Sequence, residues 1–168
     1  MQNEKFTAKE ISTLSGGAVT PSVIAQWIAR GHLGTAIPEA KAGKPRHFTA
    51  HNVLEILFTA RLHALGLPVG NANAVFWQLF DERRAEMGVI IAWGANTNYK
   101  PQIYSGVGTV PELIETIGAS GGWLSVSHFI AEVRAKLQRT IEDRNVDAGI
   151  ARHTDMPSDD TDGGWTGR

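Results

Sequence analysis

Hydrophobic residues in the first part of the chain recur at helical spacing in three short blocks. The pattern predicts helices over residues 8–14, 21–30 and 50–65. In the second block, Ile24, Trp27 and Ile28 fall on one face, and Gln26 and Arg30 point elsewhere. The third block is apolar around much of its circumference, so we expect it to be the central buried helix.

Helix start signals precede all three blocks. Thr7 and Glu10 have the spacing of a capping box, in which the two side chains satisfy each other's backbone N–H groups. Thr49 repeats the threonine cap before the third block. Thr20 followed by Pro21 is a favourable start for the second block, and glycine follows its last turn. Two short helices joined by a glycine-containing turn have the outline of a helix-turn-helix.

Residues 34–47 have no helical period and are interrupted by glycine and proline. They predict an extended loop or a short hairpin. Three cations, Lys41, Lys44 and Arg46, lie within six residues of this segment.

The second half of the chain has a mixed pattern. A further helix is predicted over 71–86, a β-hairpin over 89–106, a short helix over 111–117 and a last helix over 125–143. The last helix carries a long apolar stripe, which its own domain or a second copy must cover.

Residues 144–168 are polar, glycine-rich and acidic, which predicts a disordered tail. We therefore expect a mostly α protein in three parts. These are a helix-turn-helix domain with supporting helices over 1–87, a small α+β region over 88–143, and the tail over 144–168.

Composition and charge narrow the function classes. The 168 residues suffice for one compact domain or two very small ones. The absence of cysteine excludes disulfides, thiolate metal sites and cysteine nucleophiles. The sequence has neither a continuous apolar run of membrane-span length nor the apolar core of a secretory signal, so we expect no membrane partner and a cytoplasmic location.

The net charge is only −1, but the charges are unevenly placed. Lys and Arg outnumber Asp and Glu seven to four over residues 1–66, and five Asp face two Arg over residues 145–168. A basic front and an acidic end indicate an anionic partner for the front part, although random surface charge explains the same counts.

Three segments in order, FTAKEISTLSG (6–16), VIAQWIARGHL (23–33) and PRHFTAHNVLEILFTARLHALGL (45–67), resemble the winged helix-turn-helix of MerR-type transcription regulators and the related phage excisionases. The W-I-x-R-G-x-L part of the second segment is the most family-like. The resemblance covers about 40% of the chain. Ala25 stands where many such regulators carry a basic residue.

The resemblance implies that residues 21–30 enter the major groove of duplex DNA and that the basic loop grips phosphates as a wing. Gln26 would read a base, since its amide can pair with adenine. The DNA-binding residues implied in this way are Thr20, Ser22, Gln26, Arg30, Lys41, Lys44 and Arg46.

Other interpretations of these residues stay open. Gln26 and Arg30 also suit an ordinary solvated helix face, and the loop cations suit a soluble loop. Trp27 lies on the apolar face, so we expect it to be in the core rather than at a ligand. His47 and His51 lack a third partner and do not share a helical face, so no metal site is expected.

Two functions remain in competition at this point. The first is a sequence-specific DNA-binding transcription regulator that acts as a homodimer, because two copies match two half-sites. The second is an antitoxin-like or adaptor protein that reuses the fold for protein binding. No catalytic set and no cofactor are expected, and the sequence leaves open whether an effector binds.

Overall fold

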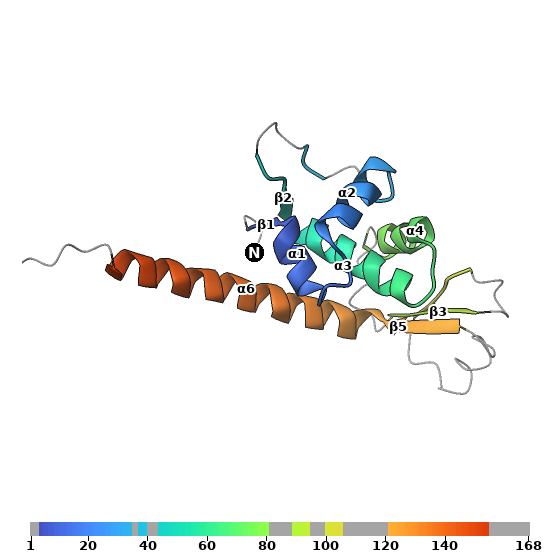
Figure 1. Cartoon of the computed structure of the whole chain (residues 1–168). Coiled ribbons are helices and arrows are strands. Elements are labelled where there is room, and N and C mark those ends of the chain that lie inside the picture. The colour runs from blue at the N-terminus through green and yellow to red at the C-terminus, as the bar shows by residue number, and fades with distance from the viewer. Residues whose placement is uncertain are drawn as a thin grey trace, which may run out of the picture.

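The computed structural model describes residues 4–34, 37–39, 44–80, 89–94, 100–105 and 121–154. The elements, in chain order, are β1 (Lys5–Thr7), α1 (Ala8–Leu14), α2 (Pro21–Ala29), β2 (His47–Thr49), α3 (Ala50–Ala64), α4 (Val69–Phe80), β3 (Val89–Gly94), β4 (Gln102–Ser105), β5 (Gly121–Ser125) and α6 (Val126–Thr154). The described part is mostly helical, as expected, and it also contains two small antiparallel sheets (Figure 1).

A two-stranded sheet joins the start of α1 to the start of α3. Its strands pair antiparallel with Phe6 opposite Phe48, and both rings are buried. Each strand ends in a threonine that caps the helix after it. Thr7 forms the predicted capping box, with 2.7 Å from its backbone nitrogen to Glu10 Oε2 and 3.3 Å from Glu10 nitrogen to Thr7 Oγ1. The strand pairing itself was not predicted.

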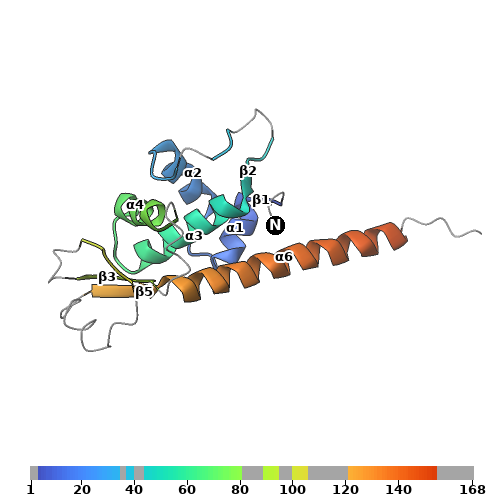
Figure 2. The same cartoon turned by 180° about the vertical axis from the view of Figure 1, so that it is seen from behind.

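Helix α3 is the centre of the hydrophobic core, as predicted. Nine of its residues are buried, including Phe58 and Leu62. Helices α1, α2 and α4 pack around α3. Helix α6 runs along the side of these helices that is remote from α2 (Figures 1 and 2). The ring of Phe58 packs edge-on against Phe76 of α4 and Phe129 of α6, with centroid distances of 5.6 and 5.5 Å.

The second sheet has the strand order β4-β3-β5. The predicted hairpin over 89–106 is confirmed, with Ile91 of β3 opposite Ile103 of β4. Strand β5, which pairs Leu124 with Ile91, was not assigned from the sequence. It leads directly into α6, so the sheet fixes where that helix begins.

Helix α6 differs from the expectation in two ways. It continues to Thr154, so residues 144–154 are helical and the prediction of a disordered segment there is wrong. Its apolar stripe is buried within the same chain at Val126, Phe129, Ile130, Val133 and Leu137. A second copy is therefore not needed to cover the stripe. One continuous core joins residues from both sides of the boundary placed at residue 87.

The remaining expectations lie partly outside the described residues. Helix α4 begins at Val69 rather than at 71, and residues 81–86 are not described. The predicted helix over 111–117 and the tail beyond Thr154 also lie outside the described residues. None of the described helices is long and apolar enough to span a membrane.

Candidate nucleic-acid interface

Helix α2 presents one face to the core and the other to solvent. Thr20 is its N-cap and accepts a hydrogen bond from the backbone nitrogen of Val23 at 3.3 Å. Ile24 and Trp27 are buried, with 1% and 7% of their surface exposed, and Trp27 packs edge-on against His63. Trp27 is therefore a core residue, as predicted. These anchors turn the opposite face outward.

The exposed face of α2 carries the residues that the sequence placed there. Ser22, Ala25 and Gln26 are exposed, as is the C-cap residue Arg30. Thr20 Oγ1 and Ser22 Oγ lie 2.9 Å apart, and one hydroxyl hydrogen serves that contact. The other hydroxyl hydrogen of the pair is left to donate to an external acceptor.

The loop that returns from α2 to β2 is described in part. Lys44 is exposed, whereas Arg46 is half-buried. The Nε atom of Arg46 is buried and has no hydrogen-bond partner among the described residues. Lys41 lies outside the described residues, so its predicted place on the interface is untested.

A groove runs between the start of α1, the length of α2 and residues 45–48. We call it the α2 groove. Its volume is about 550 Å³. The residues that define it here are Lys9, Pro21, Ile24, Ile28, Arg46 and Phe48. Apolar side chains form the floor of the groove, and the cationic side chains of Lys9 and Arg46 lie in its wall.

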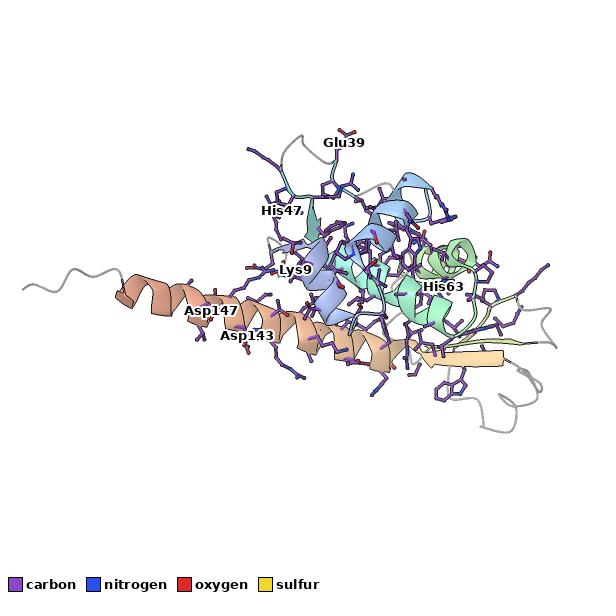
Figure 3. The ribbon with its side chains drawn as sticks, viewed as in Figure 1. Lys9, Glu39, His47, His63, Asp143 and Asp147 are labelled. Carbon is purple, nitrogen blue, oxygen red and sulfur yellow. The ribbon has the colours of Figure 1, made fainter. Side chains whose placement is uncertain are left out.

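Lys9 was not among the residues singled out from the sequence. It is exposed at the start of α1, two residues after Thr7, which pairs with His47 (Figure 3). In a capped amphipathic helix an exposed lysine is ordinary, so the local pattern carried no signal. Only the β1–β2 pairing brings it to the same groove as Arg46.

A buried carboxylate holds the chain segment that leaves α2. Glu55 of α3 is 1% exposed, and its Oε1 accepts three hydrogen bonds. The donors are the backbone nitrogen of Gly34 at 2.6 Å, Asn73 Nδ2 at 2.7 Å and Trp77 Nε1 at 3.2 Å. A Cβ atom at Gly34 would overlap the Trp77 ring, so a larger residue there would displace that ring. This contact fixes the end of α2 against α3 and α4.

A second contact ties α6 to the start of the chain. The Arg144 guanidinium donates from Nε and Nη2 to Glu10 Oε1 at 2.9 and 2.5 Å, and from Nη1 to the Lys5 carbonyl at 3.0 Å. It also lies 4.8 Å from the centre of the Phe6 ring. Glu10 thus serves both the capping box and α6.

The pKa of Glu10 reflects these partners. Burial raises the pKa of the carboxyl, but hydrogen bonds from the Thr7 backbone and side chain and the charged Arg144 outweigh burial. The net effect is a pKa below the ordinary value of 4.5. The ionised form is therefore favoured in the folded chain.

The two histidines considered from the sequence lie at the surface near the start of α3. His47 and His51 are exposed, and the His51 ring packs against Phe76 and Trp77. Within the part of the chain that the structure describes, no three His, Asp or Glu side chains are arranged to hold a metal ion.

No protein-family model and no curated protein matches this sequence. The functional conclusion therefore depends on the geometry of α2, the α2 groove and the basic residues around them.

Proposed function

We propose that the chain is a sequence-specific, double-stranded DNA-binding transcription regulator with a winged helix-turn-helix. In this proposal α2 enters the major groove, and the loop before β2 is the wing. The observation that carries the proposal is the exposed face of α2, which presents Ser22, Gln26 and Arg30 while Ile24 and Trp27 hold the helix in the core.

The dimensions of α2 suit this role. An α-helix with its side chains is about 10–12 Å in diameter, and the major groove of B-DNA is about 12 Å wide, so α2 fits across the groove. Ala25 is small and exposed, so it lets the helix approach base edges closely. Gln26 lies beside it with an amide that matches the donor and acceptor pair of adenine.

Basic residues near α2 supply contacts to phosphates. Arg30 closes the helix, and Lys44 and Arg46 lie on the wing, with Lys9 beside Arg46 in the groove wall. The net charge of the chain is −1, so affinity for DNA must come from this local cluster rather than from the whole protein.

A homodimer belongs to the same proposal. Two copies of one recognition helix match two half-sites of an operator. The far half of α6 projects away from the rest of the molecule, and Val146 on it is 60% exposed (Figures 1 and 2). A single exposed valine is ordinary on a protein surface, so the dimer is supported by the match to two half-sites and not by this residue.

One observation favours the alternative of an antitoxin-like or adaptor protein. The floor of the α2 groove is apolar, with Pro21, Ile28 and Phe48 on it. An apolar floor adds nothing to phosphate binding, whereas it can bind an apolar side chain of a peptide.

Selection of binding sites from random duplex DNA tests the proposal. The intact protein should enrich one motif, and a symmetric motif would support the dimer. Gln26→Ala should relax the preference at one base position by ~1–3 kcal/mol and leave nonspecific binding nearly unchanged. Gln78→Ala, at an exposed position of α4, is the matched control and should select the wild-type motif.

Two outcomes would contradict the proposal. If no motif is enriched at low salt, the claim of sequence-specific DNA binding is refuted. Equal loss of specific and nonspecific affinity in Gln26→Ala would make Gln26 a backbone contact instead of a base reader.

A further inference from the structure

The α2 groove has two properties that DNA contacts alone do not use. Its floor is apolar, and the buried Nε of Arg46 in its wall has no hydrogen-bond partner among the described residues. The Arg46 side chain is half-buried and positively charged, so an anionic group in the groove can pair with its guanidinium. The groove therefore suits an occupant that is apolar at one point and anionic beside it.

The chain itself contains such a segment. Residues 155–168, DMPSDDTDGGWTGR, place Asp159, Asp160 and Asp162 shortly before Trp165. We propose that this segment docks in the α2 groove of the same chain, with the Trp165 indole on the apolar floor and the aspartates at Lys9 and Arg46.

The chemistry of the two parts is complementary. An indole ring buries a large apolar area and needs only one hydrogen-bond acceptor, so Pro21, Ile28 and Phe48 can surround it. A carboxylate accepts charge-assisted hydrogen bonds from a guanidinium, so an aspartate in the groove can pair with the Arg46 side chain that lines it. The spacing of three to six residues between the aspartates and Trp165 spans about 10–20 Å in extended chain, enough to reach from the floor to the wall cations.

The length of chain permits the contact. Arg144 touches Lys5 and Glu10, and Glu10 adjoins Lys9 in the groove wall. From Arg144 to Thr154 the helix advances about 15 Å, and the following stretch to Trp165 can extend about 36 Å. The projecting end of α6 also lies on the side of β1 and β2, not on the side of β3 and β5 (Figures 1 and 2). The segment can therefore turn back and reach the groove.

Docking would have a consequence for DNA. The aspartates would neutralise Lys9 and Arg46, and the segment would cover the wall of α2 beside Ala25. If the tethered segment has an effective concentration of about 1 mM and an intrinsic Kd near 0.1 mM, the apparent DNA affinity falls about tenfold. This consequence depends on the proposed DNA-binding function, whereas docking does not.

A nitroxide label tests docking directly. The natural chain has no cysteine, so Gly167→Cys gives a single labelling site in the full-length protein. Paramagnetic broadening is then measured at backbone amides. We expect strong broadening at Ala25, Ile28 and Ala29, and much weaker broadening at the amides of β5, which lies at the end of the molecule away from β1 and β2 (Figures 1 and 2). Trp165→Ala combined with Asp159→Asn, Asp160→Asn and Asp162→Asn should abolish the broadening.

Three results would overturn the proposal. The first is the absence of broadening in the groove. The second is broadening that survives the combined substitutions. The third is broadening that appears only between molecules, when nitroxide-labelled protein is mixed with an isotope-labelled copy that carries no nitroxide. That result would assign the segment to the groove of a second molecule.

Duplex DNA titrations keep this test separate from the proposed function. If groove broadening is present but no duplex binds, docking stands and the DNA-binding proposal fails. If DNA binds but the groove amides are not broadened, docking fails and the DNA-binding proposal stands. If both hold, the combined substitutions should raise the DNA affinity about tenfold, whereas unchanged affinity would refute competition between the segment and DNA.

Discussion

The three hydrogen bonds to Glu55 Oε1 lead to a sharp prediction for stability. In Glu55→Leu, the donors on Gly34, Asn73 and Trp77 lose their acceptor together. These donors are only partly buried, so the lower end of the cost of an orphaned donor applies, about 1 kcal/mol each. We therefore expect Glu55→Leu to lower the free energy of unfolding by about 3 kcal/mol.

Glu55→Gln removes the negative charge but keeps an oxygen that can accept hydrogen bonds. The glutamine oxygen can occupy the Oε1 position and receive all three bonds. The second oxygen, Oε2, has no partner among the described residues, so replacing it with an amide nitrogen removes no such bond. We expect Glu55→Gln to cost less than about 1 kcal/mol. Glu132→Gln, at an exposed carboxylate paired with Lys136, serves as a surface control and should change stability by less than about 1 kcal/mol.

Urea denaturation measures the difference. With a slope near 2 kcal/mol/M, the Leu variant should unfold at a midpoint about 1.5 M lower than the wild type, and the Gln variant close to the wild type. Hydrogen exchange at the Gly34 amide should accelerate only in the Leu variant. Equal destabilisation by Leu and Gln would refute the reasoning, because it would show that the charge rather than the acceptor is required.

Three further predictions follow from the same structure. Trp27→Ala should cost ~3–5 kcal/mol of stability, read from thermal or urea unfolding; a variant with wild-type stability and lost DNA binding would move Trp27 to the contact surface. Arg144→Met should cost about 1 kcal/mol at neutral pH, because it removes a partly exposed ion pair with Glu10. The pKa of Glu10 is lowered in the folded chain, so its stabilising effect is present above the ordinary value of 4.5 and is lost as pH falls through the folded pKa. The stability difference between wild type and Arg144→Met should therefore narrow in acid. A constant difference from pH 7 to pH 3 would contradict the role given to Glu10.

The local parts of the fold were predictable because their causes are local. Thr7 with Glu10, Thr20 with Pro21, and Thr49 all start helices where the sequence indicated. The buried and exposed faces of α2 follow from periodicity alone. These features depend on residues within one turn of each other, which a sequence pattern records directly.

The parts that were missed depend on residues far apart in the chain. Strand β1 has three residues and pairs with a strand about forty residues later, so no alternation announced it. Glu55 lies in an apolar helix, and only the fold brings Gly34 and Trp77 to it. Lys9 joins the candidate site for the same reason.

The length of α6 has a different cause. Residues 144–154 are too polar to predict a buried helix, but the buried stripe from Val126 to Leu137 already forms the first turns. Once a helix is nucleated, each added residue gains a backbone hydrogen bond without a new nucleation cost. The helix therefore continues past its packed part.

The most direct test of the central claim is the salt dependence of binding to the selected duplex, measured by fluorescence anisotropy with the full-length protein. If Lys9, Arg30, Lys41, Lys44 and Arg46 neutralise phosphates, the slope of log Kobs against log salt should be about −4 to −5 per bound chain. Lys41→Ala with Lys44→Ala should flatten the slope by up to ~2 units. Binding with a slope near zero, or no binding at low salt, would contradict the account and favour the adaptor function.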